Sequence, residues 1–230
     1  MSSNAGQRDE ANEGGDSGKW PDPLWVFGYG SLTWKVGFEH EEAVPCFIEG
    51  YVRRFYQFSE DHRGVPGAPG RVVTLMESEN EHDRVWGVAY RIHSDRADDI
   101  MAHLDYREKG GYKTQVVEAV VHEEHVDNVG TSSLNCLVYV GTEDNPQFTG
   151  VRDEEEIARV IATSVGPSGP NSEYLLNLAH ALREIAPHHP DDHIDRLERL
   201  VRRHLDEKGS NSNDNNSSSS SSSSDDKAKT

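Results

Sequence analysis

The hydrophobic pattern of this chain changes its period once, and that change limits the folds open to it. Between residues 24 and 141 apolar residues gather in short runs rich in β-branched and aromatic side chains, which is typical of strands. From residue 153 onward they recur every three to four positions, which is typical of amphipathic helices. The strand-like runs are LWVFGY, YVRRFYQF, RVVTLM, VWGVAYRI, TQVVEAVVHE and LNCLVYVG. The order predicts an α+β fold with a small mixed sheet or barrel and flanking helices.

One amphipathic helix is predicted between the fourth and fifth strands. Ala97, Ile100, Met101 and Leu104 fall at i, i+3, i+4 and i+7, so they share one face. Ser94 is expected to cap its start, and the glycines at 110 and 111 are expected to end it. Three further helices are predicted within residues 153–165, 172–186 and 190–208, packed on the sheet as part of the same domain.

The two ends differ in composition from the middle. Residues 1–23 are nearly free of large apolar side chains, and residues 209–230 form a polar tract containing eight consecutive serines. Such segments bury too little apolar surface to offset the entropy of ordering. We therefore expect a disordered N-terminal segment at 1–23, one domain at 24–208 and a disordered tail at 209–230.

The charge and the cysteine count exclude several kinds of protein. The net charge of −18 argues against nucleic acid or an anionic membrane as a partner, because both require a basic surface. The N-terminal stretch lacks the apolar core of a signal peptide, and no apolar run reaches the length of about 18 residues typical of a membrane span. Cys46 and Cys136 fit no metal spacing, so a reduced, buried pair is expected. Together these features predict a cytoplasmic protein.

The stretch FGYGSL, residues 27–32, places two glycines around a tyrosine directly after an apolar run. A dinucleotide-binding turn would need glycine at Thr33, and a serine nucleophile elbow would need glycines at Tyr29 and Thr33. The remaining interpretation is a turn through Gly28 and Gly30 whose backbone N–H groups, with the Ser31 hydroxyl, point at one anion. Glycine would allow the positive φ and the close approach that such a nest requires. A plain turn remains the alternative.

A second stretch, DYREKGGY at residues 105–112, lies where the predicted helix ends. Its Glu108 would sit near the negative end of the helix dipole, which makes a carboxylate more basic. Partial burial would raise its pKa further, toward the range that a general base needs near neutral pH. A solvated last helical turn is the alternative interpretation.

The order and length of several motifs resemble the ChaC-type, glutathione-specific γ-glutamylcyclotransferases. The resemblance runs from about Leu24 to Leu205 and rests on WVFGYGSLTWK, RRFYQFSEDHRGVPGAPGRVVTL, VWGVAYRI, REKGGY, YVGTEDNPQFTG and GPSGPNSEYL. It implies a compact α+β domain around a small β-barrel, with the site at the barrel mouth and with neither a metal nor an organic cofactor. It also implies that Glu108 is the catalytic residue. The segment implied to bind the γ-glutamyl group comprises Val26, Phe27, Gly28, Tyr29, Gly30, Ser31 and Leu32.

The resemblance implies that the partner is a small molecule, reduced glutathione, which is cyclised to 5-oxoproline with release of Cys-Gly. Two alternatives stay open: the same reaction on γ-glutamyl amino acids or γ-glutamylamines, and a binding module without catalysis that recognises a γ-glutamyl group or a partner protein.

Several residues are candidates for supporting roles. Arginines supply positive charge in an acidic domain, and one of them could bind the glycine carboxylate of glutathione; the candidates are Arg53, Arg54, Arg63 and Arg71. Tyr112 and Tyr139 could lend hydroxyl groups to the site. The glycine- and proline-rich loop at residues 60–70 is either a lid or a plain long turn. His122 and His125 are spaced by three, not the four of a helical zinc site, so no metal is expected.

Overall fold

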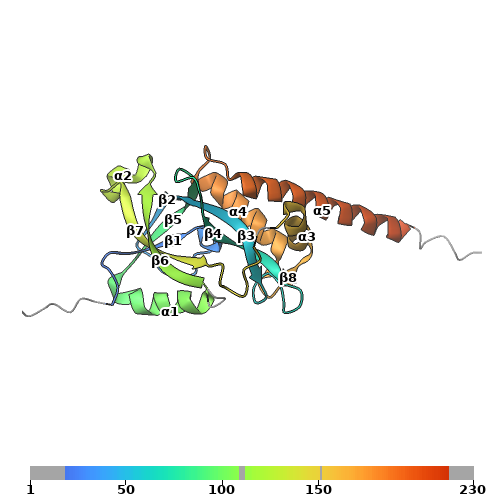
Figure 1. Cartoon of the computed structure of the whole chain (residues 1–230), viewed down its shortest axis with the longest axis horizontal. Helices are drawn as coiled ribbons and strands as arrows, with labels where there is room; N and C mark the ends of the chain where they lie inside the picture. The colour runs from blue at the N-terminus through green and yellow to red at the C-terminus, as the bar shows by residue number, and fades with distance from the viewer. Residues whose placement is uncertain (1–18, 109–111, 151, 218–230) are drawn as a thin grey trace, which may run out of the picture.

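Five strands close into a barrel; α3, α4 and α5 lie on one side of it, and α1 lies below it in the view of Figure 1. The computed structural model describes residues 19–108, 112–150 and 152–217. The strands are β1 Leu24–Gly28, β2 Glu42–Glu49, β3 Tyr51–Ser59, β4 Gly70–Glu77, β5 Arg84–Ile92, β6 Tyr112–Val121, β7 Ser133–Gly141, β8 Val165–Gly166 and β9 Gly169–Pro170. The helices are η1 Ser31–Thr33, η2 Ser94–Arg96, α1 Ala97–Arg107, α2 Glu123–Val129, α3 Glu154–Thr163, α4 Asn171–Ile185 and α5 Asp192–Ser217. The predicted α+β class, with a small barrel and flanking helices, is confirmed.

The barrel order is β1-β5-β2-β6-β7, and β1 closes it by pairing antiparallel with β5 and parallel with β7. Side chains of β1 alternate between two cores. Trp25 and Phe27 belong to the larger core, whereas Leu24 and Val26 belong to a second core under α1. Burial on both faces explains why β1 is an uninterrupted apolar run.

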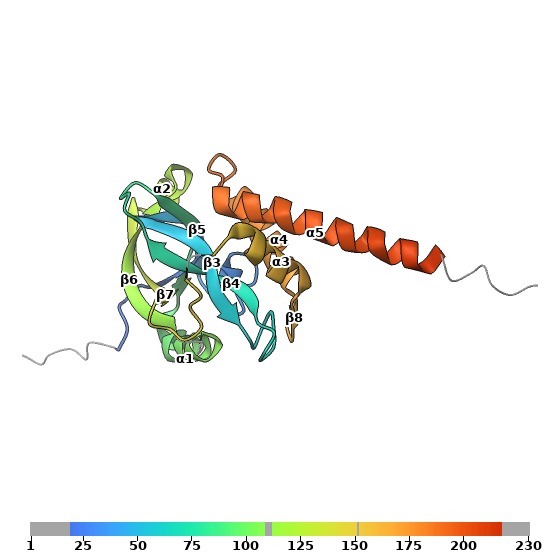
Figure 2. The same ribbon diagram turned by 45° about the vertical axis from the view of Figure 1, so that its right-hand side comes forward.

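The larger core joins the barrel to the helices. It contains Val138 from β7, Phe55 from β3, Ile161 from α3, Leu178 from α4 and Leu197 from α5. The hairpin β3–β4 lies between the barrel and these helices in both views (Figures 1 and 2). The prediction that the helices belong to the same domain as the strands is therefore confirmed.

The predicted apolar face of α1 is also confirmed, because Ala97, Ile100, Met101 and Leu104 are all buried. The predicted cap is wrong: the chain first makes the short turn η2, and the His93 side chain accepts a hydrogen bond from the Asp95 N–H. The predicted stop at residues 110 and 111 lies outside the described residues.

Strand β2 and helix α2 are among the elements that were not predicted. Strand β2 carries Pro45, which in sequence argues against a central strand. The Pro45 carbonyl accepts a hydrogen bond from the N–H of His122, just past the end of β6. The N–H that proline lacks would therefore lie at the end of the β2–β6 pairing. Helix α2 begins where the predicted strand run ends: the His122 side chain accepts from the Glu124 N–H and starts the helix.

The structure describes residues beyond both of the predicted domain ends, 24 and 208. Trp20, expected in a disordered segment, packs against the second core and donates from Nε1 to Asp98 at 2.9 Å. Helix α5 runs to Ser217, past the predicted domain end at residue 208. A helix that is already nucleated gains one hydrogen bond for each residue added, so a polar composition does not stop it.

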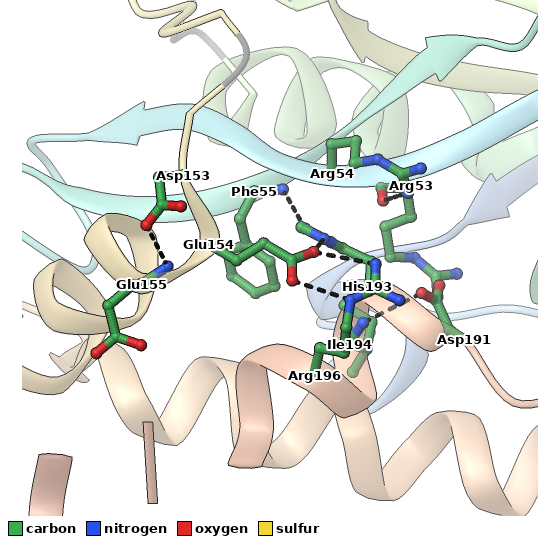
Figure 3. A network of polar contacts seen from close by, with 10 residues as sticks. All are labelled: Arg53, Arg54, Phe55, Asp153, Glu154, Glu155, Asp191, His193, Ile194 and Arg196. Atoms are coloured by element: carbon green, nitrogen blue, oxygen red, sulfur yellow. Dashed lines mark hydrogen bonds and ion pairs between the residues drawn. The ribbon is translucent and has the colours of Figure 1, made fainter. Parts of the chain in front are cut away.

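A polar network ties the starts of α3 and α5 to β3 (Figure 3). His193 lies 3% exposed; its Nδ1 lies 3.0 Å from Glu154 Oε1, and its Nε2 accepts from the Phe55 N–H at 3.3 Å. An imidazole that accepts at Nε2 is neutral. Burial lowers the pKa of His193, and the hydrogen bond to Glu154 opposes that shift.

This arrangement predicts a loss of stability in mild acid. Below the ordinary histidine pKa of about 6.5 the unfolded chain takes up a proton that the folded chain resists, so the free energy of unfolding falls as pH falls, by at most about 1.4 kcal/mol per pH unit. Urea unfolding between pH 7.5 and 5 measures the slope. His193→Gln, which keeps a neutral acceptor and donor, is expected to flatten it. His82→Gln, at an 80% exposed side chain, should not; equal slopes in all three proteins would contradict the prediction.

Candidate active site

A cavity of about 780 Å³ opens between the end of β1, the end of α1, the hairpin β3–β4 and the start of α4. Its volume lies in the range of small-molecule sites. Most of the residues that line it carry polar or charged groups: Ser31, Lys35, Gln57, Ser59, Glu60, Asp61, His62, Arg63, His103, Arg107, Glu108, Tyr112, Gln147, Ser168 and Tyr174. The two sequence stretches singled out above, FGYGSL and DYREKGGY, meet here although they lie far apart in the chain.

The FGYGSL segment reaches this cavity through Ser31. Strand β1 ends at Gly28, and η1 begins at Ser31. Neither Gly28 nor Gly30 has a positive φ, so that part of the expected nest is wrong. Both positions favour glycine because other atoms leave little room for a side chain. A Cβ on Gly28 would lie 2.5 Å from Leu32 Cβ, and one on Gly30 would lie 3.0 Å from Tyr174 Oη.

The other side chains of the predicted binding segment lie in the cores. Val26 and Leu32 belong to the core under α1, and Phe27 and Tyr29 belong to the larger core. The Tyr29 hydroxyl donates to the Tyr139 carbonyl at 2.8 Å. Within this segment, therefore, Ser31 is the residue that lines the cavity. The first N–H groups of a helical turn have no partner within the turn, which leaves those of η1 as donors.

Glu108 caps the C-terminal end of α1, and its N–H donates to the Leu104 carbonyl at 2.8 Å. Its side chain is 21% exposed and lines the cavity. Burial raises the pKa of this carboxyl, the Arg107 guanidinium opposes that shift, and Asp61 adds to it. A carboxylate with a raised pKa on a cavity wall is suited to proton transfer near neutral pH.

Arg107 was not predicted as a site residue, although it lies in the same motif. It joins the two stretches: Nη2 donates to Ser31 Oγ at 2.5 Å, and Nε lies 3.4 Å from Glu108 Oε1. Nη1 donates to the carbonyls of Val36 at 3.1 Å and Lys35 at 3.3 Å.

Two tyrosines, Tyr112 and Tyr174, line the same cavity as Glu108. Tyr112 lines the cavity and donates to the Val73 carbonyl at 3.3 Å, and burial keeps its pKa well above the ordinary value. Tyr174, which was not predicted, also lines the cavity, and burial raises its pKa too. Tyr139 does not line the cavity; its hydroxyl donates to Asp105 Oδ1 at 2.7 Å. Of the two predicted tyrosines, the cavity therefore includes only Tyr112.

Among the candidate arginines, only Arg63 lines the cavity. Its Nη1 donates to the Pro170 carbonyl at 3.0 Å and lies 3.4 Å from Glu173 Oε1. Arg71 is buried and its guanidinium lies over the Phe58 ring, at 4.6 Å from the centroid. Arg54 donates to the Arg53 carbonyl, and Arg53 pairs with Asp191. Arg53, Arg54 and Arg71 are thus parts of the framework and not of the cavity wall.

The loop at residues 60–70 forms one wall of the cavity. It is held by the β8–β9 hairpin, since the Ser168 N–H donates to the His62 carbonyl at 2.9 Å. Within the loop, Val65 and Ala68 pair through their backbones. In this structure the loop is packed against its neighbours on the cavity wall.

The described residues contain no group of three or more His, Cys, Asp or Glu side chains arranged to hold a metal ion. Cys46 and Cys136 are both buried and free. Over the same residues, no helix is long and apolar enough to cross a membrane.

Comparisons with known proteins converge on one family. The family model described as ChaC-like protein matches residues 24–204. A protein of Schizosaccharomyces pombe named glutathione-specific γ-glutamylcyclotransferase is 41% identical over 193 residues, which cover 79% of this chain and 94% of that protein. The human protein named glutathione-specific γ-glutamylcyclotransferase 1 is 39% identical over 177 residues, 76% of each chain.

A solved structure agrees. The crystal structure of the yeast γ-glutamyl cyclotransferase specific to glutathione superposes with a TM-score of 0.73 at 33% identity, covering 78% of this chain and 96% of that one.

Proposed function

Because this chain belongs to the ChaC-like protein family, we propose that it is a glutathione-specific γ-glutamylcyclotransferase that converts reduced glutathione to 5-oxoproline and Cys-Gly. The observation that carries the proposal is the meeting of Ser31 and Glu108 on one cavity wall, linked by Arg107. The sequence relatives named above support the substrate. The reaction is an intramolecular cyclisation that consumes no water.

The chemistry follows from the groups of the substrate. Folding the γ-glutamyl chain back brings its α-amine within range of its own γ-carbonyl, and attack there forms a five-membered lactam. An α-ammonium has a pKa near ~8, so only about a tenth of it is neutral at pH 7. Glu108 takes the proton from the ammonium and then delivers a proton to the departing amine of Cys-Gly as the C–N bond breaks. One carboxylate thus serves as general base and general acid.

The turn at Gly30 and Ser31 is proposed to hold the α-carboxylate of the γ-glutamyl group. Its backbone N–H groups and the Ser31 hydroxyl suit a permanent anion. Fixing that carboxylate holds the folded conformer in which amine and carbonyl meet, which is a proximity effect. Tyr112 and Tyr174, kept protonated by burial, are hydrogen-bond donors on the same wall.

Arg63 is proposed to bind the glycine carboxylate, because it is the candidate arginine on the cavity wall. Losing a hydrogen bond to a charged group costs about 1.5–3 kcal/mol, so Arg63→Met is expected to raise KM for glutathione roughly tenfold to a hundredfold, with a smaller effect on kcat. Steady-state kinetics measures both constants. Arg84→Met, at an exposed arginine outside the cavity, serves as the control. An unchanged KM in Arg63→Met would remove Arg63 from the binding site.

The proposed partner is thus a small molecule, and no cofactor takes part in the proposed steps. We further propose that the protein acts in the cytoplasm, where glutathione is kept reduced. The acidic net charge of −18 disfavours nucleic acid as a partner.

The experiment that tests the function is incubation of the purified protein with reduced glutathione and, separately, with γ-glutamyl-alanine, following 5-oxoproline and the released amine by mass spectrometry. Product from glutathione alone is expected. Product from the dipeptide alone would keep the chemistry but change the substrate. Absence of product from both would favour a binding module without catalysis.

A further inference from the structure

The Arg107 side chain contacts several separate segments of the site. Arg107 is the last residue of α1, and one guanidinium contacts the Ser31 hydroxyl, the Val36 and Lys35 carbonyls and the Glu108 carboxylate. The side chain is 18% exposed, so these contacts are largely shielded from water. They span the turn after β1 on one side and the helix end on the other.

The geometry of the guanidinium makes this possible. Arginine presents five N–H donors in a rigid planar fork, whereas lysine offers one ammonium on a flexible stem. Here each of the three nitrogens faces a different partner: Nη2 the turn, Nη1 the backbone that follows it, and Nε the carboxylate. Moving the fork would therefore change the distance between the turn and Glu108.

We propose that Arg107 is a positioning residue for the cyclisation, which holds the Ser31 turn and the Glu108 carboxylate at a fixed separation. The inference rests on the proposed function, in which the turn binds the α-carboxylate and Glu108 moves the proton. The turn and Glu108 act on atoms of the same γ-glutamyl group. The distance between them therefore determines whether the α-amine lies next to the Glu108 carboxylate. A misplacement of about 1 Å costs on the order of a hundredfold in rate.

Arg107 also acts on Glu108 through its charge. The charged and titratable groups around this carboxylate come from every neighbouring element: Arg107 and His103 on α1, Lys35 after η1, Asp61, His62 and Arg63 in the loop at 60–70, Tyr29 beside β1, Tyr112 on β6, Tyr139 on β7 and Tyr174 on α4. Burial and Asp61 raise the pKa of Glu108, and Arg107 lowers it. Removing the positive charge would therefore raise the pKa further.

The test compares Arg107→Met with Arg107→Lys in the full-length protein, measuring kcat and KM for glutathione from pH 5 to 9. Both variants are expected to lower kcat by roughly tenfold to a hundredfold, because neither side chain can bridge the turn and the carboxylate. Arg107→Met is also expected to move the acid limb of the kcat profile to higher pH, since the base now loses its proton at higher pH. Arg107→Lys retains the charge and should keep the limb near that of the wild type.

Arg96→Met is the matched control. Arg96 precedes α1, and its ion pairs with Glu39 and Asp99 are exposed; such pairs contribute little. Its kcat and acid limb should be unchanged. A second measurement is the titration of the Glu108 carboxyl by carbon NMR in the wild type and in Arg107→Met. It measures the effect of the Arg107 charge on the pKa of Glu108 without depending on activity.

Three outcomes would overturn the inference. One is wild-type kcat in Arg107→Met. Another is a lower kcat with a lower melting temperature but an unchanged acid limb and carboxyl titration, which would mean that Arg107 only stabilises the fold. The third is a wild-type protein that forms no product from glutathione, which would overturn the proposed function as well. If instead the wild type forms product, Glu108→Gln abolishes it and Arg107→Met behaves as wild type, the inference alone fails.

Discussion

Glu108→Gln is expected to lower the turnover of glutathione by roughly 10²- to 10⁴-fold, the range for losing a general acid or base. Glutamine has nearly the same shape but cannot take the proton from the α-ammonium or return one to the leaving amine. The fold should persist, because the helix contact at this position is made by the backbone N–H, which donates to the Leu104 carbonyl. Single-turnover measurement of 5-oxoproline formation gives the size of the loss.

A matched control and a binding measurement separate chemistry from folding. Glu118→Gln changes an exposed glutamate on β6 and should leave turnover unchanged. Glu108→Gln should still bind glutathione in calorimetry, because the α-carboxylate is proposed to bind at the turn. Turnover near that of the wild type would end the assignment of Glu108 as the base. Loss of binding together with activity would point to damage to the cavity.

Gly64→Ala is expected to destabilise the protein by more than about 3 kcal/mol, beyond the usual cost of overpacking. A Cβ at this position would lie 2.1 Å from the Gly70 nitrogen, 2.6 Å from the Pro69 carbonyl carbon and 2.6 Å from the Ser59 carbonyl oxygen. All three are backbone atoms, so no side chain can rotate away. The loop at 60–70 must open, and the cavity wall that it forms must move with it. Urea unfolding measures the first effect, and KM for glutathione measures the second.

The neighbouring residue provides the comparison. Val65→Ala alters a side chain that is 42% exposed in the same turn, and it should change the free energy of unfolding by less than about 0.5 kcal/mol. If Gly64→Ala lowers the free energy of unfolding as little as Val65→Ala does, the loop does not pack closely against its own ends, and the prediction is wrong. A loss of stability with an unchanged KM would mean that the loop does not contact substrate.

Local pattern was sufficient for most of the fold. Runs of β-branched and aromatic residues predicted the strands β1, β3, β4, β5, β6 and β7, and the 3.6-residue period predicted the helices α1, α3 and α4 close to their bounds and the start of α5. Local pattern failed at β2, where the proline argued against a strand, and at α2, where a histidine cap started a helix after β6. At β2 the contact is distant in sequence, since the His122 N–H donates to the Pro45 carbonyl, whereas at α2 it is local, since the His122 side chain accepts from the Glu124 N–H.

The sequence by itself determined the class of the fold, the family and two short stretches of the site, because glycine spacing and a charged helix end are local features. Tertiary structure decided which side chains of those stretches reach the cavity. Val26 and Phe27 lie in the cores because β1 is covered on both faces, and Tyr29 and Leu32, which follow β1, are buried in the same two cores. Arg107 and Ser31 are 76 residues apart, and their contact exists only because the barrel brings the end of β1 to the end of α1. The hydrophobic period cannot predict such a contact. It shows which face of one helix or strand is buried, but not which helices and strands pack together.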